Sequence, residues 1–328
     1  MSRLLYFILF TILISCSSFN RDFKQHNFLK SASWKTQIKN SLEQRVVSEN
    51  QEVRKFVNEL KEQHQIQGHE FKTKDSLMME DIRESLRALP KNLHDYLSDK
   101  VAGVLLIRDL HVPVAIQKLS DSHKYLLFID REINSMGLND WYRWREYSAF
   151  GKPKTDFLME PYLSHTNSQK DTIDYILSQA IALLLSHEED LFPKSLAGQP
   201  IADLIFIKRS WLNNKGIIQS KADTLLDEMK FISFYGASTR TFPQERIYEF
   251  YQKLEKTNFT NLYSSTGAFK DFIESMATYI HVFIFRRPFQ IDFYEKEILL
   301  DSFSHCLNKP RCLGKRKDLS IIVGKYLK

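Results

Sequence analysis

The residues of this sequence that could do chemistry are carboxylates and imidazoles on or beside two long apolar stretches. In Ala268–Phe285, four polar residues recur at i, i+3, i+7 and i+10 and so share one stripe of a helix: Asp271, Glu274, Thr278 and His281. Glutamate and histidine in such a stripe can bind a metal ion or transfer protons. The same stripe fits the exposed face of an amphipathic helix or a structurally paired set, so the spacing alone leaves these interpretations open.

A second set of candidate metal ligands flanks the other apolar stretch, Thr172–Ser186. His165 precedes this stretch, and His187 and Glu188 follow it directly. A zinc-binding helix needs a second histidine four residues after the first, and position 191 is a leucine. The spacing therefore gives no reason for these side chains to meet. The sequence also has no recognisable glycine-rich phosphate loop, nucleophile elbow or cysteine nucleophile.

The stretch Thr172–Ser186 is predicted to be a helix of four turns that is buried on all sides. Past Asp174, its only polar side chains before the end are Ser178 and Gln179. A helix that is apolar nearly all round lies at the centre of a large domain. This one is too short, and too polar at its middle, to span a bilayer.

The N-terminus predicts export and lipidation. Arg3 supplies a positive charge before the apolar run Leu4–Ile14, which is too short for a transmembrane helix and typical of a secretory signal. The run ends in a lipobox-like sequence, so we expect a lipoprotein signal peptide at residues 1–15 and a diacylated Cys16. Several acyl chains give stable anchoring, because each buried methylene contributes about 0.8 kcal/mol. An ordinary signal peptide with an incidental cysteine, or a membrane anchor, is the alternative.

Charge and the remaining cysteines limit the partners and the compartment. Ser17 follows the lipidated position where an acidic residue would signal retention, so by resemblance to lipoprotein sorting we expect an envelope protein at the outer membrane. The net charge of +6, from 46 basic and 40 acidic residues, is dispersed and indicates no nucleic-acid partner. In an exported protein, Cys306 and Cys312 suggest a small disulfide loop. Zinc binding by this pair is disfavoured by the absence of CxxC spacing.

Changes of periodicity predict the other elements. Residues 16–32 are expected to be a polar tether, and amphipathic helices over 33–68 to pack on a main domain that starts at residue 69. Further helices are expected at Asp75–Leu89, Asn92–Asp99, Thr241–Lys256 and Ala268–Phe285. Three β-prone runs predict a three-stranded, mainly antiparallel sheet: Val101–Arg108, Val112–Leu119 and Lys124–Asp130. The aromatic cluster Asn139–Phe150 is either a binding platform for sugar or peptide or a set of core residues.

Three blocks of the sequence together resemble a family of bacterial cell-envelope zinc metallopeptidases of the gluzincin type. The first comprises Ile129-Asp130-Arg131-Glu132 and the segment Asn139-Asp-Trp141-Tyr-Arg-Trp144-Arg-Glu146. The second is the apolar helix, which keeps Tyr175-Ile176-Leu177 of the family's pattern. The third is Asp271–Phe289, similar to the family's Glu-Asp-Phe-x-Glu-Ser-Phe helix and closing Pro-Phe. The resemblance covers roughly residues 89 to 291.

In that family, the apolar helix carries His-Glu-x-x-His, whose histidines bind zinc and whose glutamate is the general base. Here Gln179, Ala180 and Leu183 stand at those positions. Leucine has no lone pair, the amide is a poor zinc ligand and alanine cannot accept a proton. Glu274 stands where the family has its glutamate ligand, although Lys270 departs from an acidic position. The resemblance thus implies a vestigial site at Gln179, Ala180, Leu183 and Glu274, with Asp271, Tyr279 and His281 as accessory residues.

These observations predict an α+β fold, namely a mainly helical zincin-like domain at residues 69–328 with a small, mostly antiparallel sheet. We expect no metal and no cofactor, and we expect Gln179 to face Glu274 across a dry former site. The predicted function is that of a membrane-anchored, catalytically inactive metallopeptidase-like module for binding or scaffolding. A peptide partner would add a strand beside Tyr125–Asp130, in the former substrate cleft. The alternatives are an active metal-dependent peptidase with an unrecognised ligand set and a plain envelope spacer.

Overall fold

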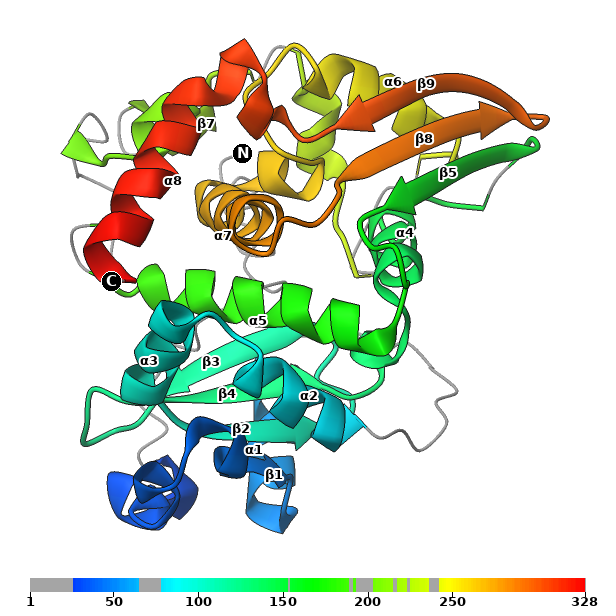
Figure 1. Ribbon diagram of the computed structural model, residues 1–328. Helices are drawn as coiled ribbons and strands as arrows, with labels where there is room; N and C mark the ends of the chain where they lie inside the picture. Colours follow the sequence, from blue (N-terminus) through cyan, green and yellow to red (C-terminus); the bar gives the residue numbers. More distant parts are fainter. Residues whose placement is uncertain are drawn as a thin grey trace, which may run out of the picture.

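The computed structural model describes residues 26–64, 78–152, 154–188, 191–192, 203–214, 217–222, 225–235 and 242–327. Within them the fold is α+β, as expected. Figure 1 shows helix α5 (Gln169–Leu185) lying between a sheet on one side and helix α7 (Ala268–Tyr279) on the other. The predicted lipidation site Cys16, the signal peptide and the boundary near residue 68 lie outside the described residues.

The sheet under α5 has four strands in the order β1-β2-β4-β3. The strands are β1 (Val46–Ser48), β2 (Val101–Ile107), β3 (Val114–Lys118) and β4 (Tyr125–Asp130). Strand β2 pairs in parallel with both β1 and β4, and only β3 runs antiparallel to its neighbour β4. The expectation of a three-stranded, mainly antiparallel sheet is therefore wrong for this part of the chain.

The strands of this sheet are buried on both faces. Along β4, Leu126 and Phe128 join a core on the side of helix α1 (Gln51–His64), whereas Leu127 and Ile129 join the larger core under α5. Strands that are covered on both faces read as continuous apolar runs, and such runs are typical of parallel sheets. A one-sided antiparallel sheet would instead show alternating polar residues.

The N-terminal segment is part of this fold from the first described residue. Phe28 and Leu29 are buried, so the expected tether to residue 32 ends earlier. Short 3₁₀ turns replace the first of the expected amphipathic helices: Asn27–Leu29, Ser31–Trp34, Gln37–Lys39 and Leu42–Arg45. Trp34 packs on the sheet at Gly103, where an added Cβ would lie 2.1 Å from the indole ring. Only glycine leaves room for this contact.

Helices α2 (Met78–Arg87) and α3 (Lys91–Lys100) lie on the same side of the sheet as α5 and agree with the sequence prediction. The helix expected from Thr241 starts later, as α6 (Arg246–Leu254), after a turn that follows Pro243. Thr241 itself is outside the described residues. Helix α7 continues through a π-helical turn at Ile280–Ile284, so the predicted long C-terminal helix is present.

A second sheet lies at the other end of the molecule, with the antiparallel order β5-β8-β9. It consists of β5 (Phe157–Tyr162), β8 (Gln290–Glu295) and β9 (Ile298–Ser304). A separate hairpin joins β6 (Trp211–Asn214) to β7 (Ile217–Ser220). Helix α4 (Leu138–Tyr147) runs beside β5, and the two β8–β9 strands extend away from the body as an arm (Figure 1).

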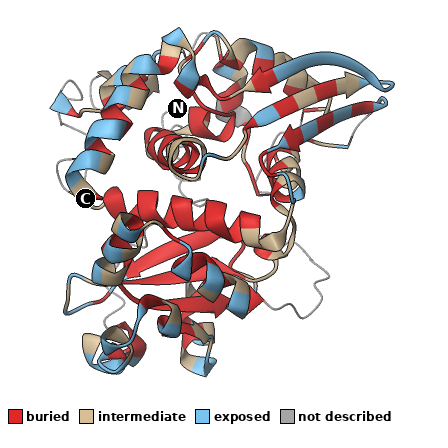
Figure 2. Ribbon diagram, viewed as in Figure 1, coloured by how far each residue is buried: buried red, intermediate tan, exposed pale blue. Residues whose placement is uncertain are grey.

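Helix α5 is the buried centre that the sequence predicts. Every residue from Asp171 to Leu185 is buried, which Figure 2 shows as a continuous buried helix. A capping box starts it: the Ser168 hydroxyl accepts from the Asp171 amide, and the Asp171 carboxylate accepts from the Ser168 amide. The cap matters because a buried helix end cannot turn to water for its first N–H groups.

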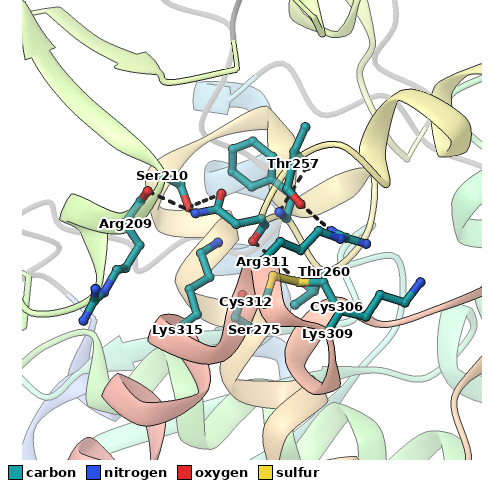
Figure 3. The surroundings of a disulfide bond; sticks show 12 residues. Arg209, Ser210, Thr257, Thr260, Ser275, Cys306, Lys309, Arg311, Cys312 and Lys315 are labelled. Carbon is teal, nitrogen blue, oxygen red and sulfur yellow. Dashed lines mark hydrogen bonds between the residues drawn. A yellow bond between two sulfur atoms is a disulfide. The ribbon is translucent and has the colours of Figure 1, made fainter.

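The C-terminal helix α8 (Leu313–Tyr326) follows a disulfide between Cys306 and Cys312, which confirms the predicted pair. Figure 3 shows this disulfide beside Arg311, which donates to the main-chain carbonyl of Thr257. The bridge closes a small loop and ties the start of α8 to the body. Among the residues described, no helix combines the length and apolarity that crossing a bilayer requires.

Candidate functional site

Glu274 is the centre of a hydrogen-bond network between α5, α7 and α4. Its Oε1 accepts from Gln179 Nε2 at 2.6 Å, and its Oε2 accepts from Arg145 Nη1 at 2.9 Å and Asn261 Nδ2 at 2.7 Å. The Tyr175 hydroxyl donates to Oε2 at 3.3 Å. All five side chains are fully buried. Four donors therefore reach this carboxylate, one at Oε1 and three at Oε2, so both of its oxygens accept hydrogen bonds.

The contact between Gln179 and Glu274 confirms the prediction made from the sequence. Gln179 sits at the middle of α5 and Glu274 at the middle of α7, where the two helices pack together. The stripe on α7 is therefore neither a solvated face nor an open half-site. It is the structurally paired arrangement, and it is buried from Asp271 through Thr278.

Arg145 is the charged residue of this network that the sequence analysis did not single out, and Asn261 and Tyr251 were not predicted either. Arg145 Nη2 donates to Glu146 Oε1 at 3.0 Å, and the Tyr251 hydroxyl donates to Glu146 Oε2 at 2.8 Å. The guanidinium carbon lies 4.3 Å from the ring centre of Tyr142 and 5.1 Å from that of Trp141. Cation–π contact and two carboxylates together stabilise the buried charge. The sequence does contain a signal for this burial. Arg145 and Glu146 follow Trp141 and Tyr142 by four residues and so share a helix face with these aromatic side chains.

Electrostatics favour a permanently charged arginine in this interior. Burial alone would lower the pKa of Arg145, but Glu274, Tyr142 and Glu146 together hold it well above the ordinary value. Burial raises the pKa of Glu146, although the neighbouring Arg145 opposes that rise. Burial also raises the pKa of Tyr251, with Glu146 adding to the effect. The network thus combines one cation with two carboxylates and neutral hydroxyls, without contact with solvent.

The expected accessory residues do not converge on Glu274. Asp271 accepts from Lys315 Nζ at 2.6 Å and from Trp211 Nε1 at 3.0 Å, so it joins α7 to α8 and to β6. His281 Nε2 lies 3.0 Å from the Leu163 carbonyl oxygen, and burial lowers the pKa of this imidazole to about 4. The ring of Tyr279 packs against Phe283, with ring centres 5.0 Å apart.

The other vestigial positions are core residues. Ala180 and Leu183 are fully buried and belong to the apolar core that surrounds α5. Where the resemblance implies a general base and a second metal ligand, they offer only hydrocarbon.

The alternative ligand set is separated by the length of α5. His165 lies before the helix, beside Tyr162, whereas His187 and Glu188 lie beyond its last residue, with His187 packed on Tyr125. At about 1.5 Å per residue, a helix of this length keeps its two ends more than 20 Å apart. In the part of the chain that the structure describes, no three histidine, cysteine, aspartate or glutamate side chains are grouped closely enough to hold a metal ion.

The residues present do not fit the zinc ion that the family resemblance implies. Both oxygens of Glu274 already accept hydrogen bonds, and an amide and a leucine stand where the resemblance implies histidines. The Arg145 guanidinium lies beside Glu274 and would repel a second cation. No catalytic step through a metal can be derived for this site.

The structure also tests the predicted aromatic platform and the predicted peptide-binding strand. Trp141 and Tyr142 in the aromatic cluster are fully buried, so these rings are core residues rather than a binding platform. Strand β4 lies between β2 and β3, so both of its edges are already paired. A peptide cannot add a strand beside Tyr125–Asp130, and that part of the predicted cleft is wrong.

The fold and the buried network define an α+β protein with a polar cluster sealed inside its helical layer. Comparison with models of protein families, with curated proteins and with solved structures finds no match for this chain.

Proposed function

We propose that this protein is a membrane-anchored bacterial lipoprotein whose metallopeptidase-like domain is catalytically inactive and acts as a binding or scaffold module. The observation that carries the proposal is that both oxygens of Glu274 accept hydrogen bonds from buried side chains. Gln179 and Arg145 both donate to the carboxylate that would otherwise bind a metal ion.

A catalytic centre of this reaction class needs a bound metal with an open position and a base that can take a proton from water. Here the corresponding volume is filled by side chains that are fully buried. A substrate peptide would have to displace the Arg145–Glu274 pair to enter, and breaking a buried pair costs about 3–5 kcal/mol. A stable internal support for the fold is the role that best accounts for these contacts.

The inactive centre is tested on the full-length protein, purified in detergent from a bacterial host. Zinc, manganese, iron and cobalt are measured by mass spectrometry, and cleavage of fluorogenic peptide mixtures and casein is followed with and without a chelator. We expect far less than one metal ion per chain and no cleavage that the chelator abolishes. Stoichiometric zinc with chelator-sensitive cleavage would instead establish the active metal-dependent peptidase.

The lipid anchor is tested separately. Cells expressing the chain are labelled with a clickable palmitate analogue, and their membranes are separated on a sucrose gradient. We expect label in the wild-type protein, recovery with outer-membrane fractions, and loss of both in Cys16→Ser. A Cys16→Ser protein that remained in the membrane pellet would contradict lipid anchoring and favour a membrane-embedded N-terminus.

A further inference from the structure

The outward face of the β5–β8–β9 sheet carries an exposed apolar row. Leu158 on β5 lies opposite Tyr294 on β8, which lies opposite Leu299 on β9, so the three side chains share one face. Leu158 is 39% exposed and Leu299 52%. Figure 2 shows the outer part of this sheet as largely exposed. Adjacent apolar side chains that remain open to solvent on a small sheet mark an interaction surface.

An acidic row follows on the same face. Glu160 lies opposite Asp292, two residues along each strand from the apolar row. With Asp140 and Arg143 of α4 they line a surface pocket of about 400 Å³. Three carboxylates against one guanidinium leave the pocket an excess of two negative charges, whereas the whole chain carries +6.

The groups in this pocket have unused capacity for a cation. Arg143 is held by the Met159 carbonyl oxygen, 3.0 Å from its Nε, and its Nη1 lies 3.5 Å from Asp140. Asp292 accepts from two uncharged side chains, those of Gln290 and Ser302. Within the described part of the chain, Glu160 has neither a hydrogen bond nor a cation within 4 Å. Like charges directly opposite on paired strands destabilise a sheet, and a bound cation would relieve this pair.

The free edge of β5 is closed by α4, so a ligand meets the face of the sheet instead. The Met159 amide donates to the Tyr147 hydroxyl at 2.7 Å, and its carbonyl accepts from Arg143. The side-chain oxygen Oδ1 of Asn139 accepts from the main-chain amides of Leu163 and Ser164 at 2.8 and 3.0 Å. These contacts use the main-chain groups that an added strand would need.

We propose that the outward face of β5–β8–β9 binds an extended polypeptide segment in which an arginine lies two residues from an apolar side chain. The guanidinium would enter the pocket between Glu160 and Asp292, beside the exposed ring of Tyr162. The apolar residue would cover Leu158 and Leu299. The two rows are about 7 Å apart along a strand, which is the spacing of side chains i and i+2 in an extended peptide. Arginine suits the pocket because it pairs with two carboxylates and stacks on aromatic rings.

This inference gives the proposed binding module a surface, and it rests on the proposed function only in that the chain has a partner. The probe is a random heptapeptide library displayed on phage and selected on the full-length protein in detergent. Selected peptides are then labelled with fluorescein and titrated by polarisation. We expect enrichment of arginine two positions from leucine, isoleucine, valine or phenylalanine.

Matched variants test where the selected peptides bind. Glu160→Gln with Asp292→Asn keeps the shape of both side chains and is expected to weaken binding at least tenfold, and Leu158→Ser with Leu299→Ser to do the same. Glu84→Gln with Asp99→Asn removes two exposed carboxylates from α2 and α3 and is expected to leave affinity unchanged. Melting curves check that each variant is folded.

Three outcomes would overturn the inference. The selected peptides could show no enrichment of basic residues, or they could bind the Glu160/Asp292 variant as tightly as the Glu84/Asp99 variant. Spermidine could also bind the protein as tightly as the selected peptides do. Each leaves the inactive centre untouched, because metal content and cleavage are measured independently. Conversely, an active zinc peptidase whose selected peptides still require Glu160 and Asp292 would overturn the proposed function and keep this surface.

Discussion

At the scale of single residues, the chemistry of the interior depends on how a buried carboxylate is neutralised. Glu274 lies fully out of contact with water, where an isolated charge is strongly disfavoured. Arg145 provides the positive charge and Gln179 a further donor, so these two side chains neutralise and solvate the buried carboxylate. A pair of this kind is a weak source of net stability, yet loss of one partner leaves the other charge without compensation.

Arg145→Met is therefore expected to destabilise the protein by about 3–5 kcal/mol. The reason is the orphaned carboxylate of Glu274 rather than lost packing, since methionine keeps much of the side-chain volume. Urea unfolding followed by circular dichroism measures the change. Adding Glu274→Gln to this variant should recover part of the loss, because it removes the uncompensated charge. Arg87→Met, at an exposed position of α2, is the control, with an expected cost of less than about 1 kcal/mol. An Arg145→Met protein as stable as this control would contradict the account.

Buried histidines give the fold a defined response to acid. Burial lowers the pKa of His281 and of His305 to about 4, compared with about 6.5 in an unfolded chain. Between these values the unfolded chain binds protons that the folded chain does not, so stability falls as the pH is lowered from about 6.5 towards 4. Between pH 7 and pH 5, each of these two histidines is expected to lower the free energy of unfolding in urea by about 1–2 kcal/mol, whereas Asp130, whose pKa burial raises to about 7, acts in the opposite direction.

The matched variant for this pH effect is His281→Gln, whose amide can still donate to the carbonyl oxygen of Leu163. The difference between its free energies of unfolding at pH 7 and pH 5 should be smaller than that of the wild type, by roughly the contribution of one histidine. Identical slopes for the two proteins would show that His281 is not held neutral by the fold.

At the scale of elements, α4 has two functional faces that serve different neighbours. Trp141 and Arg145 point into the core, where the buried network lies. Asn139, Arg143 and Tyr147 recur every four residues on the other face and bond to the main chain of β5 and the residues after it. The helix thus seals the edge of the second sheet and positions the cation of the interior at the same time.

Asn139→Ala is expected to cost about 1–3 kcal/mol, because its side chain accepts from two main-chain amides and donates to the Ser164 carbonyl oxygen. Asn58→Ala, an exposed change on α1, should be neutral or slightly stabilising because alanine favours helix. Chemical denaturation provides the comparison, and hydrogen exchange should show faster opening at Leu163 and Ser164 only in the first variant. Equal stabilities for the two variants would refute the sealing role.

Elements whose amino-acid composition indicates burial could be predicted from the sequence. Helix α5 is apolar nearly all round, which fixes both its helical state and its central position. The disulfide follows from two nearby cysteines in a chain with an export signal. The contact of Gln179 with Glu274 was within reach because a buried amide must find a partner.

Other features depend on long-range packing that composition does not show. The pairing of Val46–Ser48 with β2 joins segments more than fifty residues apart, and nothing local marks such a short strand. Continuous apolar runs in β2 and β4 indicated burial on both faces, but the expectation followed the short connections and gave an antiparallel sheet. The burial of Arg145 is not predicted from the sequence, because a charged side chain is seldom found wholly inside a protein. The position enters only as part of the Trp144-Arg-Glu146 motif.

At the scale of the whole molecule, the four-stranded sheet is shared by two cores. One core contains Phe56 of α1 together with Phe128 of β4, and the other extends from β4 through α5 to α7 and α8. Successive residues of the same strands contribute to both, so neither core can form fully without the other. We therefore expect the described residues to unfold as one cooperative body, across the boundary near residue 68 that the sequence suggested.

A chain that starts at residue 69 should consequently fail to fold, although the sequence placed a domain there. It lacks β1, α1 and Trp34, so one face of the sheet, with Leu105 and Phe128, would be exposed to water. We expect this truncation to bind a hydrophobic dye, to elute in large aggregates and to melt without a cooperative transition. A chain that starts at residue 26 keeps the whole second core and should melt cooperatively at the temperature of the longer protein. If instead the shorter chain were monomeric with a sharp transition, the N-terminal layer would be an appendage, and the sheet would owe its stability to the α5 side alone.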